Sequence, residues 1–392
     1  MYDRMQTLPE QSFLLLGPRG TGKSTWLRDR LLGSAWFDLL DAEIYRELMA
    51  SPERLERRIP KGHKGWVVID EVQRVPELLN EVHRLIETRG LRFALTGSSA
   101  RKLRRGGVNL LAGRALSLHM HPLVCAEIGA DWDLRKALEL GGLPLAVTAA
   151  DRTAARAYLN SYVGTYLREE VQQEGLSRNL PGFARFLEVA SFSQGMPLNI
   201  TAVASECGVE RKVVESWFGI LEDLLLATRL PVFARRAKRA VTKHPKFFYF
   251  DVGIYRTLRP RGPLDAVSEI DGAALETLLL QEVRAHNDVH NLGYQLSFWR
   301  TRAGLEVDLV LYGEKGLLAF EVKRADRVRP EDLKGLRAFG EEYPPAQLFF
   351  LYGGDREFVD DGVRIVPFKR AIETLPQILT GPRVSQAVKR RN

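Results

Sequence analysis

The residues best suited to chemistry lie near the start of the chain, at positions 17–24. They fit the G-x-x-x-x-G-K-[ST] pattern throughout, follow an apolar run at 13–16 and precede a segment with helical spacing at 25–32. The backbone N–H groups of such a loop, with those of the first helical turn, surround a polyphosphate. We therefore expect Lys23 to reach the β- and γ-phosphates of ATP and Ser24 to ligate Mg²⁺.

A pair of acids follows the next strongly apolar run, at 66–69. Asp70 and Glu71 fit the Walker B pattern, in which the first acid holds the Mg²⁺ shell and the second polarises the attacking water. A solvated acid pair at a strand end is the alternative. The predicted nucleotide-binding residues are Gly17, Pro18, Arg19, Gly20, Thr21, Gly22, Lys23, Ser24, Thr25, Asp70 and Ser98.

Length and composition indicate a globular chain of several domains. The 392 residues exceed one ordinary core, and 45% hydrophobic with 27% charged residues is typical of globular proteins. We find no apolar run long enough to span a membrane and no secretory signal, so we expect a cytoplasmic protein without membrane partners. Two distant cysteines match no metal spacing. The formal charge of +8 favours an anionic partner such as DNA.

The middle of the chain predicts a helix-turn-helix with a wing. Helical segments at 183–192 and 200–206 precede a glycine turn, and a longer helix begins near Glu210. Between Arg235 and Lys246 the sequence holds six cations and no acid, which favours phosphate contacts. A packing module is the alternative, because acids in the two helices would repel phosphate; these acids are Glu206, Glu210 and Glu215.

The last third carries a second acidic pattern, on a predicted hairpin at 305–311 and 316–323. Asp308 on one strand and Glu321-x-Lys323 on the next, with Glu276 on a preceding helix, resemble the core of PD-(D/E)xK nucleases. The resemblance implies that Glu276, Asp308 and Glu321 bind a divalent metal and that Lys323 activates water. Glu282 is the second choice for the helix acid. A structural salt bridge between Lys323 and either strand acid would also explain the pattern.

Four further stretches make a family resemblance specific. The sequence at 111–115, 122–127, 141–144 and 162–169 resembles bacterial and archaeal AAA+ ATPases that carry a C-terminal domain of unknown function 4143. Where family members often have Arg-Asp after Tyr-Leu, this chain has Arg-Glu-Glu at 168–170, which leaves the role of that acid open.

The resemblance implies roles for three more residues. Arg114 corresponds to an arginine finger or sensor that stabilises the developing phosphoryl charge from a neighbouring subunit, and a structural ion pair is the alternative. The strand at 91–96 would lie between the phosphate-loop and Walker B strands, so Thr96 or Ser98 would be its polar sensor. Ser98 is equally suited to cap the next helix.

We therefore predict an α/β protein with a P-loop AAA+ domain at 1–180, a winged helix at 181–255, a nuclease-like domain at 256–380 and a basic tail at 381–392. The expected function is ATP hydrolysis with Mg²⁺ by a ring-shaped homo-oligomer, such as a hexamer, that acts on DNA and can carry metal-dependent nuclease activity. A regulatory nucleotide switch that binds a protein partner, with a degenerate nuclease fold, is the alternative.

Overall fold

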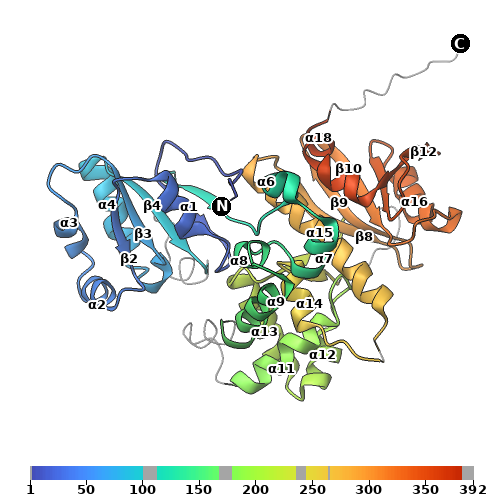
Figure 1. Ribbon diagram of the computed structural model, residues 1–392, viewed down its shortest axis with the longest axis horizontal. Helices are drawn as coiled ribbons and strands as arrows, with labels where there is room; N and C mark the ends of the chain where they lie inside the picture. Colours follow the sequence, from blue (N-terminus) through green and yellow to red (C-terminus); the bar gives the residue numbers. More distant parts are fainter. Residues whose placement is uncertain (1, 100–112, 167–178, 235–243, 264, 382–392) are drawn as a thin grey trace, which may run out of the picture. The chain divides into compact units, whose positions relative to one another are not determined.

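The computed structural model describes residues 2–99, 113–166, 179–234, 244–263 and 265–381 (Figure 1). The chain forms two compact units, each built from separate stretches of sequence. The first comprises Met1–Phe192, Ile200–Thr228 and Tyr249–Pro260, and the second Ser193–Asn199, Arg229–Phe248 and Arg261–Asn392. Part of the predicted winged-helix range thus belongs to the second unit.

The first unit contains a five-stranded sheet in the order β2-β3-β4-β1-β5. Every neighbouring pair is parallel. The strands are β1 (Phe13–Leu16), β2 (Ala35–Asp38), β3 (Trp66–Asp70), β4 (Arg92–Gly97) and β5 (Leu116–His119). Because the carboxyl ends of parallel strands meet at one edge, the residues after β1, β3 and β4 come together there. This order confirms the α/β prediction and places β4 between the phosphate-loop strand and the acid strand.

Helices cover both faces of this sheet (Figure 1). Trp66 and Val68 share one core with residues of α1 (Lys23–Arg30), whereas Val67 and Ile69 share the other core with residues of the remaining helices. This alternation follows from the two-residue period of a strand and explains the continuous apolar run. The helices on the second face are α2 (Ala42–Ala50), α3 (Arg54–Arg58) and α4 (Leu78–Arg89).

The stretch 42–58 forms two helices rather than one. Ser51 between them has φ −151° and ψ 82°, outside the helical region. Pro52 explains the break, because its ring disfavours helical geometry in the preceding residue.

Short helices complete the first unit, and two of them form the predicted helix-turn-helix. Gly208 takes φ +65° in the turn, and the second helix of the motif starts immediately after Glu210, as predicted. The rings of Phe186 and Trp217 lie 5.3 Å apart and fix the motif against the helix that precedes it. The helices are α6 (Cys125–Ile128), α7 (Leu134–Leu140), α8 (Pro144–Val147), α9 (Arg152–Ser161), α11 (Leu180–Ser191), α12 (Ile200–Cys207), α13 (Arg211–Asp223) and α14 (Val252–Leu258), with short helical turns η1 (Val72–Arg74), η2 (Gly129–Asp131) and η3 (Tyr162–Tyr166).

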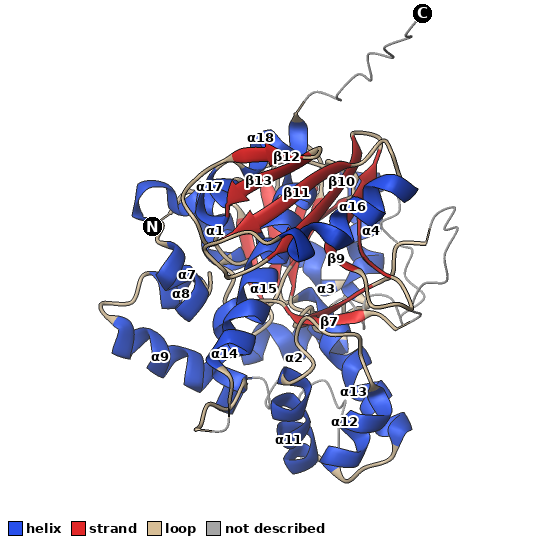
Figure 2. Ribbon diagram, turned by 90° about the vertical axis from the view of Figure 1, so that its right-hand side faces the viewer, coloured by secondary structure: helices blue, strands red, loops and turns tan. Residues whose placement is uncertain are grey.

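The second unit is built on a six-stranded mixed sheet in the order β12-β13-β11-β10-β9-β8 (Figure 2). The three strands β8, β9 and β10 form an antiparallel meander, and β11 then adds parallel to β10. The strands are β8 (Gln295–Arg300), β9 (Glu306–Gly313), β10 (Gly316–Val322), β11 (Gln347–Tyr352), β12 (Phe358–Asp360) and β13 (Val363–Pro367). The predicted hairpin is therefore present as β9 and β10.

Along the chain, helices precede the strands of this sheet, separate two of them and follow the last one. The long α15 precedes β8, and α16 connects β10 to β11, giving the order helix, three strands, helix, strand. Among the described residues, no helix has both the length and the apolar character needed to cross a membrane. The helices are α15 (Val267–Val289), α16 (Lys334–Glu342), α17 (Phe368–Glu373) and α18 (Leu375–Thr380), with the turn η4 (Pro330–Leu333); β6 (Ala227–Leu230) and β7 (Lys246–Tyr249) form a separate two-stranded sheet.

Candidate active site

The phosphate loop needs glycine at three of its positions. A Cβ on Gly17 would lie 2.3 Å from the carbonyl oxygen of Met120, so only glycine allows the loop to pass the chain after β5. Gly20 and Gly22 have φ values of +80° and +91°, which side-chain-bearing residues rarely adopt. The bond from the Trp26 N–H to the Gly22 carbonyl then starts α1. The sequence pattern thus has a local steric cause.

Lys23 lies inside this loop, with only 5% of its surface exposed. Its Nζ donates to the carbonyl oxygens of Gly17 at 2.7 Å and Pro18 at 3.1 Å. Thr21 Oγ1 donates to the same Pro18 oxygen at 2.8 Å. These bonds place the ammonium group within the cradle, where a polyphosphate would meet it.

The ends of β3 and β4 are joined through Thr96. Its hydroxyl donates to the Asp70 carboxylate and accepts the backbone N–H of Glu71 at 3.0 Å. Glu71 has φ +60°, a left-handed conformation that is costly for a residue with a side chain. The hydrogen bond from the Glu71 N–H to Thr96 holds the backbone in this conformation.

The carboxylate of Glu71 is held by two further side chains. It accepts hydrogen bonds from Gln73 Nε2 and from Ser98 Oγ, the latter at 3.2 Å. Gln73 Nε2 also donates to Ser98 Oγ at 2.9 Å, and both residues are buried. Of the two predicted sensors, Thr96 therefore contacts Asp70 and Ser98 contacts Glu71. Sequence reasoning missed Gln73, whose only signal is a polar residue two positions after the acid pair.

A cavity of about 600 Å³ opens beside the loop. Asp70 and Ser98 are buried and are not among the residues that line it. An apolar part of the wall comes from residues that the sequence analysis did not assign to the site: Leu123, Pro144 and Leu145. Leu123 lies in the stretch at 122–127 and Pro144 in the Gly-Gly-Leu-Pro stretch at 141–144, both of which carry the family resemblance. The predicted residues that line the cavity are Arg19, Gly20, Gly22, Lys23, Ser24, Thr25 and Glu71.

The N-terminal segment contributes to this cavity through Arg4, which the sequence analysis also missed. Arg4 donates to the carbonyl oxygens of Thr21 at 2.7 Å and His121 at 2.6 Å, and pairs with Glu127 at 2.9 Å. Both charged side chains are more than nine-tenths buried. Arg4 thereby ties the phosphate loop to the chain that follows β5.

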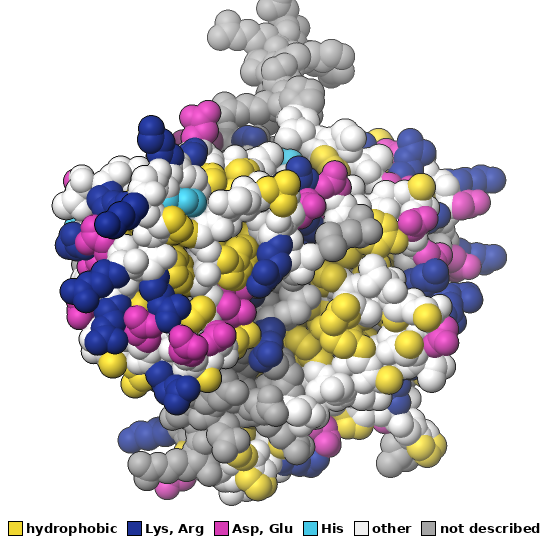
Figure 3. Space-filling view, turned by 60° about the vertical axis from the view of Figure 1, so that its left-hand side comes forward, with side chains coloured by type: hydrophobic (Ala, Val, Ile, Leu, Met, Phe, Trp, Pro, Cys, Tyr) yellow, Lys and Arg dark blue, Asp and Glu magenta, His cyan; other side chains and the backbone are white. Residues whose placement is uncertain are grey.

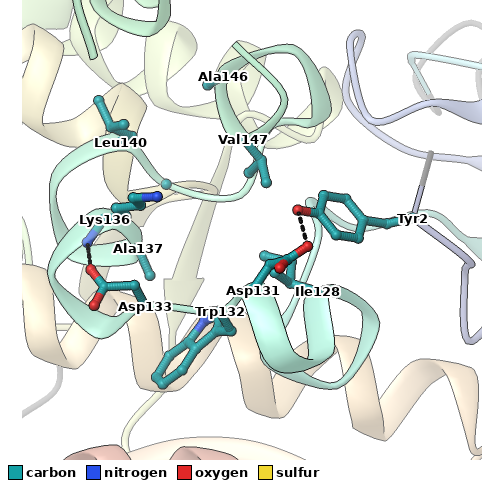
Figure 4. A pocket seen from close by; sticks show the side chains of 11 residues that line it. Tyr2, Ile128, Asp131, Trp132, Asp133, Lys136, Ala137, Leu140, Ala146 and Val147 are labelled. Carbon is teal, nitrogen blue, oxygen red and sulfur yellow. Dashed lines mark hydrogen bonds between the residues drawn. The ribbon is translucent and has the colours of Figure 1, made fainter. Parts of the chain in front are cut away.

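Tyr2 lines both this cavity and a smaller one of about 250 Å³ beside α7 and α8. Its hydroxyl donates to Asp131 Oδ2 at 3.2 Å, and Figure 4 shows the two side chains facing each other. Burial, the hydrogen bond and the charge of Asp131 raise the pKa of Tyr2. The N-terminal residues are thus anchored at two points.

Arg114 forms an ion pair with Glu87 of α4, and its side chain remains 40% exposed. This arrangement leaves open both a structural role and a role towards a neighbouring subunit. The basic loop at 101–107, the Arg-Glu-Glu at 168–170 and the wing cations at 235–243 lie outside the described residues.

One wing cation is described, and for it the prediction of a DNA contact is wrong. Lys246 is 1% exposed, and its Nζ lies 2.5 Å from Glu306 Oε1, 3.0 Å from Asp308 Oδ1 and 3.2 Å from Glu276 Oε2. The three carboxylates and the ring of Phe298 on β8 surround its ammonium group. It therefore lies among the acids predicted to bind metal.

The other predicted residues of the acidic centre are brought together as the pattern indicated. Asp308 Oδ2 accepts the N–H of Val322 at 2.9 Å, and Lys323 Nζ pairs with Glu321 Oε1 at 2.7 Å. The salt bridge that the sequence analysis left as an alternative is thus present. Of the two helix acids, Glu276 reaches Lys246. Glu282 is six residues further along α15, about 240° around the helix.

Burial and charge shift the pKa values of this centre in opposite directions. Burial raises the pKa of Glu276 to about 8, with a further contribution from Asp308. Burial and Asp308 also raise the pKa of Glu321. Burial opposes ionisation of Asp308 and Lys246 as well, yet their mutual attraction lowers the pKa of Asp308 and raises that of Lys246. Asp308 and Lys246 thus each favour the charged form of the other.

On the face shown in Figure 3, Lys and Arg side chains are interspersed with Asp and Glu. The net charge of +8 is not gathered there into one basic patch. Any phosphate contacts on this face would therefore come from local groups of cations.

Two uncharacterised proteins, Mb2031c of Mycobacterium bovis and Rv2008c of Mycobacterium tuberculosis, are similar to this chain. Each is 28% identical over 371 residues, which cover 92% of this chain and 81% of the relative.

Two solved structures were also found. The DNA complex of the Aeropyrum pernix ORC1 protein is 16% identical, with 64% of this chain and 87% of that chain covered and a TM-score of 0.24. Protein VC1899 of Vibrio cholerae is 12% identical, with 94% and 97% covered and a TM-score of 0.23. TM-scores this low give no basis for transferring a function.

Family models match three consecutive parts of the chain. Residues 131–265, which include α7 to α14, match a domain of unknown function designated DUF8612. The remaining two matches confirm the resemblance seen in the sequence: an AAA domain at residues 9–129 is followed by a C-terminal domain of unknown function, DUF4143, at residues 271–371.

Proposed function

We propose that the first unit binds and hydrolyses ATP with Mg²⁺. The observation that carries this proposal is the network in which Thr96 holds Asp70 while Ser98 holds Glu71, beside a loop that contains Lys23. The AAA domain match at 9–129 supports the same assignment. An acid pair that served only solubility would not need buried partners for each carboxylate.

Each part of ATP has a suitable environment in the 600 Å³ cavity. Loop N–H groups and Lys23 suit the phosphates, and Leu123, Pro144 and Leu145 offer an apolar surface for the adenine ring. The Ser24 hydroxyl and the Asp70 carboxylate are oxygen donors of the kind that Mg²⁺ prefers. Mg²⁺, when bound, would neutralise phosphate charge.

We assign to Glu71 the role of orienting the attacking water and accepting its proton. Gln73 and Ser98 fix the orientation of its carboxylate, which reaches the cavity wall. A fixed carboxylate can accept a proton from water and hold the attacking oxygen in line with the γ-phosphate.

The assignment is tested with Lys23→Ala and Glu71→Gln. We expect Lys23→Ala to abolish ATP binding, because the loop loses the positive charge that would contact the phosphates. Glu71→Gln should bind ATP normally but lose turnover at least about a hundredfold, because it keeps the shape and removes the proton acceptor. Nucleotide binding by calorimetry and phosphate release measure the two effects.

Glu43→Gln is the matched control, since the Glu43 carboxylate on α2 is 82% exposed. Normal turnover by Glu71→Gln would contradict the assignment. A protein that binds ATP tightly but never releases phosphate, in any assembly state, would favour the regulatory nucleotide switch.

We further propose that ATP turnover acts on DNA and takes place in a ring of subunits. The support is the helix-turn-helix, in which Arg211, Lys212 and Ser216 are exposed on α13. The positive net charge and the wing cations add to it. Glu215 is exposed on the same helix and would weaken phosphate contacts.

DNA action is tested by the salt dependence of binding. Neutralising Arg211 and Lys212 should lower the slope of log affinity against log salt by about 0.9 for each lost phosphate contact. The wing variant, in which Arg235, Arg236, Lys238 and Arg239 are neutralised, should do the same. Glu215→Gln, the control of opposite sign, should strengthen binding. Unchanged slopes in both cation variants would remove DNA from the proposal.

A further inference from the structure

The acidic centre of the second unit already contains a cation. The ammonium of Lys246 has three N–H donors and three carboxylates within 3.2 Å, from Glu276 on α15 and from Glu306 and Asp308 on β9. It also lies 5.4 Å from the centre of the Phe298 ring. Its position is therefore a coordination site filled by a side chain.

The remaining acid of the predicted metal site is also neutralised by a lysine. Glu321 Oε1 pairs with Lys323, while its Oε2 is buried without a hydrogen-bond partner among the described residues. Asp308, which lies between the two lysines, uses one oxygen for Lys246 and the other for the Val322 N–H. Each strand acid is thus paired with a lysine of the protein, through Asp308 Oδ1 and Glu321 Oε1.

A divalent metal does not fit this arrangement. Mg²⁺ needs oxygen ligands at about 2.1 Å, and a positive charge already touching the same oxygens would repel it strongly in a buried site. In keeping with this, the described part of the chain contains no group of three His, Cys, Asp or Glu residues arranged for a metal ion.

Backbone hydrogen bonds hold the residues immediately before and after Lys246. The N–H of Leu198 donates to the Pro245 carbonyl and the N–H of Gly195 to the Phe247 carbonyl, both at 2.8 Å. Gln194 Nε2 then donates to Thr277 Oγ1 at 2.8 Å, next to Glu276 on α15. A segment held in this way cannot withdraw its lysine without breaking several buried hydrogen bonds.

We propose that Lys246 is the resident cation of this centre and replaces the divalent metal that the Asp308, Glu321-x-Lys323 pattern predicts. The second unit accordingly binds no metal at Asp308 and does not cut DNA by metal-dependent hydrolysis. This inference concerns the second unit only and goes beyond the proposed ATPase.

The test compares nucleotide-free wild-type protein with Lys246→Met, which keeps the length of the side chain and removes its charge. We expect Mn²⁺ at 1 mM to leave the melting temperature of the wild type unchanged. In Lys246→Met it should raise the melting temperature by about 3 °C or more, because the freed carboxylates accept the metal. Lys246→Met/Asp308→Asn should lose this response.

Lys323→Met is the matched control, because it removes a lysine from the same centre and leaves Lys246 in place. It should give no response to Mn²⁺. If Lys246→Met shows no response, or Lys323→Met alone responds, the proposal is overturned.

A second measurement does not depend on the folding of Lys246→Met. Electron paramagnetic resonance of Mn²⁺ titrated into the wild type, with DNA cleavage assayed in parallel, reports directly on the native centre. One bound Mn²⁺ per chain that disappears in Asp308→Asn would overturn the proposal. Equal binding by wild type and Asp308→Asn, without cleavage, supports it.

Discussion

The side chain of Gln73 connects Glu71, which we assign to the attacking water, with Ser98. Its Nε2 donates both to Glu71 and to Ser98, from a position that is 3% exposed. A carboxylate held by two donors in a buried place keeps one orientation, whereas a carboxylate with one donor samples several. Gln73 is thus a positioning residue for Glu71.

We expect Gln73→Ala to lower kcat for ATP hydrolysis about tenfold and to leave KM nearly unchanged. The loss of one hydrogen bond to a charged group corresponds to about 1.5 kcal/mol or more, which is about a factor of ten in rate. Steady-state kinetics measure the split between kcat and KM.

Double variants separate positioning from a general structural effect. If Gln73 acts through Glu71, Gln73→Ala should cost little more once Glu71→Gln is present. A fully additive loss, or a kcat equal to that of the wild type, would contradict the positioning role.

Single residues could be predicted from sequence where the chemistry depends on local spacing. Lys23, Ser24, Asp70 and Glu71 follow fixed offsets from a strand end. The role of Lys246 could not be predicted, because its partners lie 30 to 62 residues further along the chain. From sequence alone it was one more cation in a basic stretch.

At the scale of elements, the N-terminal segment acts as a support for the phosphate loop. Arg4 joins it to Thr21 within the loop and to the chain after β5. Removing Arg4 would leave Glu127 buried without its charged partner, and breaking such a buried pair costs about 3–5 kcal/mol.

We therefore expect Arg4→Ala to lower the free energy of unfolding by roughly 3 kcal/mol and to raise KM for ATP. Arg30→Ala is the control, since Arg30 and its partner Asp3 are 41% and 88% exposed. Exposed pairs contribute about 0–1 kcal/mol. Denaturant unfolding and ATPase kinetics give both readouts, and equal effects of the two variants would rule out the supporting role.

The type and the bounds of an element could be predicted where a hydrophobic periodicity or a proline determines them. The strand cores, the start of α13 after Glu210 and the β9–β10 hairpin agree with the pattern. The break between α2 and α3 lies at Ser51, where Pro52 signals it in the sequence. The support from Arg4 was not predictable, because it joins positions 117 and 123 residues apart.

At the scale of the whole molecule, the proposed ring depends on Arg114. In one chain this arginine pairs with Glu87, an exposed partner that it can exchange at low cost. An arginine supplied to a neighbour's ATP would make turnover depend on assembly.

Mixing two inactive variants tests this dependence. Arg114→Ala lacks the arginine and Lys23→Ala lacks the phosphate site, so mixed assemblies should regain part of the ATPase activity at shared interfaces. Phosphate release against mixing ratio, with assembly followed by native mass measurement, is the readout. Glu87→Ala should retain activity. If both variants assemble and no mixture is active, Arg114 is structural.

The division into units shows what the sequence could not supply at this scale. From composition and motifs we predicted an ATPase part followed by a nuclease-like part. These features do not reveal that 193–199 and 229–248 leave the surrounding helical sequence and join the second unit. That exchange depends on contacts between distant segments, such as the one between Gln194 and Thr277.

The central place of β1 in its sheet has a consequence for how the protein forms during synthesis. Its neighbours β4 and β5 begin about 80 and 100 residues downstream, and Leu16 accepts a bond from the N–H of Met120. The phosphate loop is made before its sheet neighbours, and it has no fixed frame until residue 120 has left the ribosome. Pairings of such high contact order form slowly. The nascent chain should therefore acquire ATP affinity abruptly, once the cavity residues as far as Leu145 have also emerged.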